Sequence, residues 1–301
     1  MPRGFLPCYP LFMKCPFPVA TSPSGGRPGT LPGGDVCNFQ DAIYGYYHAH
    51  ARTFPWRDTR DPYCILVSEF MLQQTQTERV LGRYEAFIGQ FSDFSSLARA
   101  GTGDIVVAWQ GLGYNRRALL LKQTAELVVS RHQGRLPETP EELVLLPGIG
   151  QSTAGAVMAF AFNRPVLFIE TNIRRVFIHF FFQDRTAIRD KEILALAEQA
   201  LDREDPRNWY YALMDYGAML KETVPNPNRK SAHYTRQAAF EGSDRQARGA
   251  ILRLLSQQGQ VGEQELLALL DRDPGRAEKI LAGLEQEGFL VRAGSVVRLR
   301  Q

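Results

Sequence analysis

The amino-acid sequence predicts an all-α fold, in which a helical body is followed by a small winged-helix-like domain. From Asn38 to about Phe240, apolar residues recur at helical spacing, and short breaks rich in glycine and proline separate the helical segments. This part shows no convincing alternation of apolar and polar residues, the pattern that predicts strands. Alternation appears only near the end, in "VRAGSVVRLR", which turns at Ala293-Gly294.

The composition predicts an ordered protein with two globular units. The chain has 301 residues, of which 44% are hydrophobic and 22% charged, so it can bury a sizeable core. Prolines interrupt the early apolar stretches, and no segment of membrane-spanning length lacks proline and charge. We therefore expect a cytoplasmic protein without a membrane partner, associated with the nucleoid if its source is prokaryotic. The net charge of +3 permits nucleic-acid binding without arguing for it.

The positions of the cysteines exclude two kinds of site from the body of the chain. Cys8, Cys15 and Cys37 lie in a leader rich in proline and glycine, and Cys64 lies in a helical pattern. Neither a disulfide framework nor a four-thiolate metal site is available there. We expect no cofactor and no metal. The leader thiols either bind some group or remain unordered, and the second interpretation is favoured.

Breaks in the helical pattern divide the chain into four segments. Residues 1–36 are expected to be a disordered leader, and residues 37–228 form the helical body. Residues 229–242 follow two prolines and contain Arg229, Lys230, His233 and Arg236, so they are expected to form a basic connector. Residues 243–301 form the last domain.

This last domain has three helical patterns followed by the hairpin, an order that resembles a winged helix-turn-helix. Arg276 and Lys279 are expected on the exposed face of its third helix, and Arg292, Arg298 and Arg300 on the wing, where they meet phosphates. The domain carries nine basic and eight acidic side chains. A packing or protein-contact module therefore stays open as the alternative.

The stretch "LPGIGQSTAGAV" predicts a phosphate clamp. Gly148 and Gly150 let the chain turn sharply between two helices, so that successive N–H groups point outward beside the positive end of the second helix. Ser152 and Thr153 open this second helix and are assigned to the same DNA contact. The alternative is an ordinary turn between helices.

Two acids are candidates for catalysis. Asp61 is expected to cap a helix that begins at Pro62 and carries Glu69 two turns in, among aliphatic neighbours. Desolvation there favours the protonated carboxyl, which suits a general acid, although a buried acid paired with a base is the simpler interpretation. In "FIETNIRRV", Glu170 enters a second helix, where either it or Asn172 is expected to act as the cap.

Uncharged groups follow Glu69 directly. Gln73, Gln74 and Thr75 are able to touch bases or to fill a gap in a base stack. Trp56 and Tyr114 are candidates for stacking near an extruded base, with core packing as the alternative.

Several ordered stretches between about Phe54 and Gly217 carry a family resemblance: "PWR", "PYxIxVSExMLQQTQTxRV", "WQGLGYNRRALLL", "LPGIGQSTAGAV", "TNIRRV" and "MDYGAM". They resemble the helix-hairpin-helix DNA glycosylase superfamily, which contains endonuclease III and the adenine glycosylases of MutY type, and the second group is closer. The resemblance implies a two-subdomain helix-hairpin-helix DNA glycosylase fold over residues 37–228. It also implies a monomer that binds double-stranded DNA and rotates a target nucleotide into a cleft.

The resemblance also implies roles for the two acids. Glu69 matches the acid that protonates the leaving adenine. Base removal builds positive charge on the sugar, and Glu170 matches the carboxylate that stabilises this charge. At Ser152, members that also cleave the strand carry a lysine, so we expect base removal without an efficient lyase step.

Three departures from the family pattern leave the target base open. Most relatives place an aspartate where this chain has Glu170, and four cysteines of an iron–sulfur cluster after the segment matching "MDYGAM". This chain has no cysteine there, and its charged connector either takes over a DNA contact or is simply solvated. The domain that recognises 8-oxoguanine in adenine glycosylases is replaced by the winged-helix-like domain.

The sequence therefore predicts a monofunctional DNA glycosylase of base excision repair that removes adenine or a damaged or modified base. The competing interpretation is a DNA-binding or regulatory protein that keeps the hairpin and winged helix but has no catalytic activity. Retention of an acid at both catalytic positions favours the enzyme.

Overall fold

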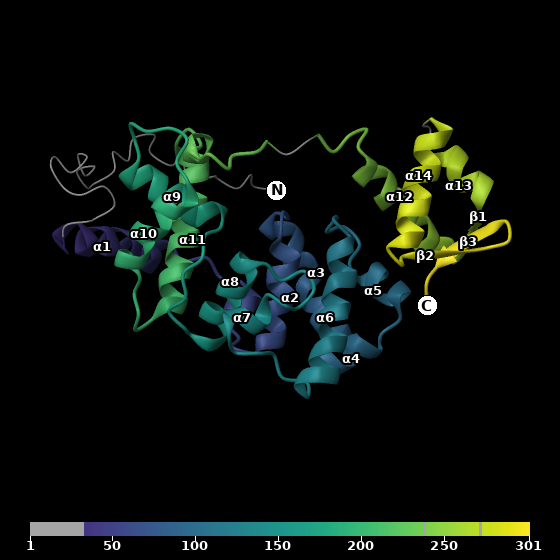
Figure 1. The fold of residues 1–301 in the computed structure, drawn as a ribbon, viewed down its shortest axis with the longest axis horizontal. Coiled ribbons are helices and arrows are strands. Elements are labelled where there is room, and N and C mark those ends of the chain that lie inside the picture. Colours follow the sequence, from purple (N-terminus) through teal and green to yellow (C-terminus); the bar gives the residue numbers. More distant parts are fainter. Residues whose placement is uncertain (1–32, 237–238, 271–272) are drawn as a thin grey trace, which may run out of the picture. The chain divides into compact units, whose positions relative to one another are not determined.

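The computed structural model describes residues 33–236, 239–270 and 273–301, and these form two compact units (Figure 1). One unit contains the described residues up to Ala51 together with Ile169–Asp202 and Asn208–Tyr234. The other contains Arg52–Phe168, Arg203–Arg207 and the described residues from Thr235 to Gln301. Most of the expected leader lies outside the described residues, and the first helix begins at Gly33, inside the range assigned to that leader.

The first unit is built from α1 (Gly33–His50), α9 (Thr171–Phe181), α10 (Asp190–Ala200), most of α11 (Pro206–Thr223) and the short η2 (Pro227–Lys230). Its core is aromatic. The ring of Phe39 lies 5.3 Å from that of Phe177 and 5.8 Å from that of Trp209, and the arrangement with Trp209 is edge to face, which aromatic quadrupoles favour. Residues far apart in the chain therefore meet in one core.

Helices α9 and α11 approach closely at Gly217. A Cβ at this position would lie 2.6 Å from both the Cβ and the carbonyl oxygen of Asn172. Glycine is therefore required for the contact, which explains why a glycine stands in "MDYGAM".

The helical part of the second unit contains η1 (Pro55–Arg57), α2 (Pro62–Leu72), α3 (Thr77–Gln90), α4 (Phe94–Arg99), α5 (Thr102–Ala108), α6 (Arg116–His132), α7 (Pro140–Leu143) and α8 (Gln151–Phe162). The predicted start of α2 is confirmed, because Asp61 accepts a 2.9 Å hydrogen bond from the N–H of Tyr63 and Pro62 is the first helical residue. Leu66, Val67 and most other α2 side chains are buried, so α2 is the central helix of this part.

The end of the chain forms a winged helix from α12 (Asp244–Gln258), β1 (Gln260–Gly262), α13 (Glu263–Leu269), α14 (Pro274–Gln286), β2 (Leu290–Ala293) and β3 (Val296–Leu299). The three predicted helices and the hairpin are confirmed, and Gly294 adopts a φ of +64° in the turn. The antiparallel sheet has the order β1-β3-β2. Strand β1 was not predicted, since three residues that pair with a distant strand leave no local pattern.

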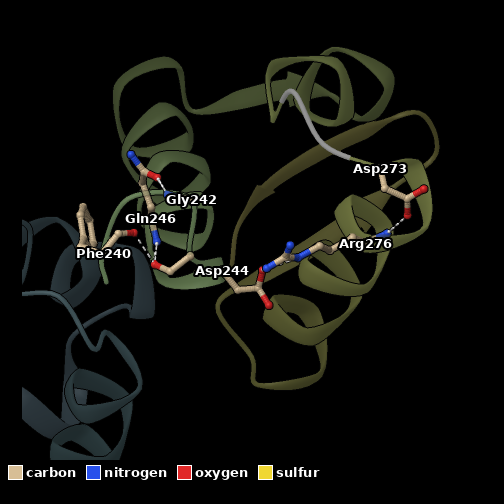
Figure 2. A network of polar contacts seen from close by, with 7 residues as sticks. Phe240, Gly242, Asp244, Gln246, Asp273 and Arg276 are labelled. Carbon is tan, nitrogen blue, oxygen red and sulfur yellow. Dashed lines mark hydrogen bonds and ion pairs between the residues drawn. The ribbon is translucent and has the colours of Figure 1, made fainter. Parts of the chain in front are cut away.

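A capping network fixes the start of α12 (Figure 2). The Ser243 hydroxyl donates to the carbonyl of Phe240 (2.6 Å) and accepts from the N–H of Gln246 (3.3 Å). The side chain of Gln246 in turn accepts from the N–H of Gly242 at 2.8 Å. These bonds satisfy N–H groups that a helix start leaves without partners and set the direction in which α12 leaves the loop.

The winged helix shares a hydrophobic core with α5 and α6. Val106 and Leu119 are buried in one cluster with Leu252 and Leu281. The N–H of Gly103 also donates a 3.0 Å hydrogen bond to the carbonyl of Arg300, just beyond β3. Within the second unit, the winged helix is therefore packed against the helical part rather than attached only through a linker.

None of the helices that the structure describes is both long and apolar enough to cross a membrane.

Candidate active site

The hairpin between α7 and α8 turns at Gly148. This residue has a φ of +78°, and a Cβ on it would lie 2.8 Å from the ring of Phe70 and 3.0 Å from the Cβ of Leu120. The expectation for Gly150 is wrong in one respect: its φ is −90°, and no atom would contact an added Cβ within 4 Å. The turn thus requires glycine at 148 but not at 150.

Gly150 is the N-cap of α8 and has no side chain to cover the first turn. Ser152 is exposed in this turn, whereas Thr153 is buried. The Thr153 hydroxyl accepts a 3.2 Å hydrogen bond from the amide of Gln73, which also donates to the carbonyl of Gly148 (3.4 Å). Gln73 therefore ties the end of α2 to the hairpin.

Thr75 and Gln74 have different roles in the loop after α2. The Thr75 hydroxyl donates to the carbonyl of Leu112 (3.3 Å) and accepts from Arg117 (2.9 Å), so it joins this loop to the loop before α6. Gln74 is exposed and has a φ of +54°, which a non-glycine residue rarely adopts. Of the two, Gln74 is the more exposed, and its contact with DNA stays a prediction.

Arg117 holds both loops in place, a role that the sequence analysis missed. Its buried guanidinium donates to the carbonyls of Phe70 (2.6 Å), Met71 (3.0 Å) and Gly113 (3.0 Å). Burial lowers the pKa of Arg117 to about 10, so the group stays charged at neutral pH. No local signal distinguishes it from its exposed neighbour Arg116, because the carbonyls of Phe70 and Met71 that it binds belong to another helix.

Trp56 and Tyr114, the two aromatic candidates for stacking on a base, lie in different environments. Trp56 is 5% exposed and stacks on Phe54 in the core, with ring centroids 4.9 Å apart, which is the packing alternative. Tyr114 is half-buried, has a φ of +46°, and lies with its ring centroid 5.6 Å from the guanidinium carbon of Arg117 and 5.0 Å from that of Arg245.

Glu69 is half-buried on α2, and Ile65 and Leu66, one turn earlier, are fully buried. Glu69 is therefore one of the partly exposed residues of a helix that is otherwise largely inside the protein. Its role as a general acid stays a prediction.

Glu170 is the N-cap of α9, one of the two capping alternatives that the sequence left open. Its Oε1 accepts hydrogen bonds from the N–H groups of Asn172 (2.7 Å) and Ile173 (2.9 Å). Its Oε2 accepts from the side-chain amide of Asn172 (3.3 Å). Burial raises the pKa of Glu170, whereas these backbone N–H groups and the nearby Arg175 and Arg174 act in the opposite direction.

Arg175 fixes the position of Asn172, which in turn holds the carboxylate of Glu170. Its buried guanidinium donates to the side-chain oxygen of Asn172 and to the carbonyl of Gly217, both at 2.6 Å. Asn172 is thereby oriented with its amide group toward Glu170. Asn172 therefore helps to hold the carboxylate of Glu170. Its role in DNA binding stays a prediction.

Known proteins resemble the chain over this whole region. The family model described as "HhH-GPD superfamily base excision DNA repair protein" matches residues 67–203. An adenine DNA glycosylase of Mycobacterium tuberculosis (strain ATCC 25618 / H37Rv) is 33% identical over 275 residues, covering 83% of this chain and 89% of the relative. The chain belongs to the HhH-GPD superfamily of base excision DNA repair proteins.

Two further matches agree with this HhH-GPD assignment. An adenine DNA glycosylase of Buchnera aphidicola subsp. Baizongia pistaciae is 34% identical over 186 residues, which are 60% of this chain and 52% of the relative. A solved structure of a thermostable thymine-DNA glycosylase superposes with a TM-score of 0.56 at 28% identity, covering 62% of this chain and 87% of the other. The protein is accordingly a DNA glycosylase of base excision repair, and DNA is its partner.

In this HhH-GPD glycosylase, the segment that follows α11 supports the helix carrying Glu170. The buried Asn228 donates a 2.9 Å hydrogen bond to the carbonyl of Thr171, the first residue of α9. Lys230 donates to the carbonyl of Gln183, whereas Arg229 is exposed. Arg229 and Lys230 were both assigned to DNA, and of these two Lys230 already binds a carbonyl within the protein.

The segment also bears on the iron–sulfur cluster of relatives. No cysteine follows Cys64 in the sequence, so the glycosylase has no thiolates there to hold a cluster. Within the described residues, no group of three or more metal-ligating side chains comes together.

The arginines expected on the surface of the winged helix include two that form ion pairs within the domain. Arg276 forms a 2.8 Å ion pair with Asp244 at the start of α12 (Figure 2), and Arg292 forms ion pairs with Glu263, Glu278 and Glu285. Arg276 is nevertheless exposed, as expected, and only Arg292 is held by several acids of the same domain. The remaining cations expected on this surface are exposed: Lys279, Arg298 and Arg300.

Proposed function

We propose that the protein removes adenine from double-stranded DNA by hydrolysis and has no efficient lyase step. The observation that supports this most directly is the placement of Glu170, whose carboxylate is held by two backbone N–H groups and Asn172. The relatives named adenine DNA glycosylase support adenine as the base. The thymine-DNA glycosylase with a similar structure makes thymine the competing substrate.

In the proposed reaction, the target nucleotide is rotated out of the duplex and its base leaves as the glycosidic bond breaks. Glu69 gives its proton to the departing base, which takes the bonding electrons. The sugar becomes a cation that Glu170 stabilises electrostatically. Water then adds its oxygen to the sugar carbon and loses a proton, which leaves an abasic site.

Ser152 supports hydrolysis rather than strand cleavage. It is exposed on the first turn of α8, and its hydroxyl does not form a Schiff base with a sugar aldehyde as a lysine amine does. Borohydride trapping on abasic DNA should therefore yield little cross-linked wild type. A Ser152→Lys variant serves as the positive control, and strong trapping of the wild type would contradict the proposal.

A panel of duplex oligonucleotides tests the substrate. Each carries one adenine, thymine, uracil or 8-oxoguanine in a defined pair, and released bases are detected by alkali cleavage. We expect excision of adenine, with losses of about 10²–10⁴-fold for Glu69→Gln and about 10²–10³-fold for Glu170→Gln. Excision of thymine alone would replace adenine as the substrate, and unchanged activity of Glu170→Gln would remove its assigned role.

We also propose that the enzyme acts as a monomer on intracellular DNA. A single module of this kind is sufficient to clamp a duplex through backbone contacts and to extrude one nucleotide. Sedimentation of the protein with and without DNA tests the first part.

A further inference from the structure

A groove lies where the loops after α2 and before α6 meet the winged helix. It has a volume of about 310 Å³, and its lining includes Gln73 and Gln74, Tyr114, and Arg245 and Arg248 of α12. All of these residues belong to the same compact unit. Residues of the last domain thus stand beside the glutamines that the family resemblance assigns to DNA.

The groove is built from residues in costly backbone conformations. Gln74 and Tyr114 both have positive φ values, 54° and 46°, which non-glycine residues rarely adopt. Arg117 holds the two loops through buried hydrogen bonds to Met71 and Gly113. Strain that the surrounding structure maintains in this way is typical of ligand-binding surfaces.

The charge of the groove favours an anion. Its lining contains four arginines and one acid: Arg116, Arg117, Arg245, Arg248 and Glu287. Arg245 also donates to the hydroxyl of Tyr114 and lies over its ring, which orients a guanidinium along the groove wall. Arg248 pairs with Glu287 at 2.7 Å, so only part of the positive charge is cancelled locally.

We propose that the sugar–phosphate backbone of the substrate duplex binds in this groove, and that α12 supplies Arg245 and Arg248 as phosphate contacts. The winged helix would then bind DNA through the first turns of α12, where these two arginines line a groove that contains a single acid, Glu287. Backbone contacts of this kind position a duplex without reading its sequence. The inference extends the proposed function, since it requires duplex DNA as the substrate, but it holds whichever base is removed.

Salt-dependent binding to a duplex tests the proposal. Fluorescence anisotropy with a labelled, undamaged duplex is measured over a series of salt concentrations for wild type and for Arg245→Ala/Arg248→Ala. Each lost phosphate contact lowers the slope of log K against log salt by about 0.9. We expect the double variant to lose about 1.8 from the slope and to bind about 10–100-fold more weakly at low salt.

Two further variants have contrasting expected results. Arg298→Ala removes an exposed arginine from β3 of the same domain and should leave the slope unchanged. Glu287→Gln removes the acid of the groove and should tighten binding.

The outcomes are distinguishable from those of the substrate assay, because binding is measured whether or not a base is released. An unchanged slope for a double variant that unfolds at the wild-type temperature overturns the groove as a DNA site. If the salt slope falls more for Arg298→Ala than for the double variant, the phosphate contact lies on the wing, and the proposal is overturned as well. If the double variant fails to fold, Glu287→Gln provides the test. Unchanged or weaker DNA binding by Glu287→Gln contradicts the proposal.

Discussion

Glu170 combines its structural task as the N-cap of α9 with the catalytic task that we propose for it. The two N–H groups it accepts from are those at the second and third positions of α9, the usual partners of an N-cap residue. The family resemblance implies an aspartate here, and the longer glutamate side chain of this protein reaches both N–H groups with one oxygen, Oε1. The exchange of aspartate for glutamate is thus accommodated locally, and Asn172 holds the second oxygen.

This double task predicts that Glu170→Gln is more stable than wild type near neutral pH, although it is far less active. The folded pKa of Glu170 lies above its ordinary value of 4.5, so the folded chain binds more protons than the unfolded chain between the two values. The stability contributed by this group is therefore complete below the unfolded pKa and is lost as pH rises through the folded pKa. The amide of the variant can still accept the cap hydrogen bonds and has no charge to bury.

Urea unfolding between about pH 4 and pH 7 measures the difference in the free energy of unfolding between Glu170→Gln and wild type. This difference should shrink as pH falls toward about 4, because the wild-type carboxyl becomes protonated. An advantage that stays constant over this range would show that the carboxylate is not penalised by burial.

Arg117 gives a second prediction at this scale. Arg117→Lys should destabilise the protein by about 2–4 kcal/mol and lower base excision, since an ammonium cannot reach all of the carbonyls that the guanidinium binds. The neighbouring exposed Arg116→Lys is the matched control and should change stability by less than about 0.5 kcal/mol. Equal stability of the two variants in urea unfolding would contradict the role of Arg117.

At the scale of helices, the contact between α9 and α11 depends on Gly217. Gly217→Ala places a Cβ where only 2.6 Å separate it from Asn172, so one helix must shift, at a cost of about 1–3 kcal/mol. Because Asn172 orients the carboxylate of Glu170, excision should fall as well. Gly82→Ala in α3 has open space and should instead raise stability by about 0.5–1 kcal/mol. Thermal unfolding with matched excision assays checks both.

Sequence patterns are informative about elements and less so about contacts between them. The cap at Asp61, the turn at Gly148 and the hairpin at Gly294 follow from local chemistry and were predicted. The same reasoning left Glu170 and Asn172 as equal capping candidates, because both residue types accept N–H bonds. The contact of Asn228 with Thr171 had no local signal, since it joins positions far apart in the chain.

At the scale of the whole molecule, the core shared by α5, α6 and the winged helix predicts coupled stability. Leu119→Ala should cost about 2–5 kcal/mol and raise amide hydrogen exchange in α12 and α14, although the residue lies in α6. Leu145→Ala, at a position that is 80% exposed, is the control. Unchanged exchange in α12 and α14 would show that the winged helix folds without this contact.

The same scale explains which ion pairs the sequence did not predict. The resemblance to a winged helix pointed to α14 and the wing, but Arg276 and Arg292 pair with acids that come from other elements of that domain. The availability of a cation depends on the neighbours that the fold brings to it, and a linear sequence does not contain that information for Arg245 or Arg248.

The shared core also has a consequence for how the chain is made. During synthesis α5 and α6 leave the ribosome first, and the face formed by Val106 and Leu119 stays open to water until α12 and α14 have been translated. A product of premature termination before α12 therefore exposes an apolar surface that the finished protein covers. Such fragments should therefore be more prone to aggregation than the full chain.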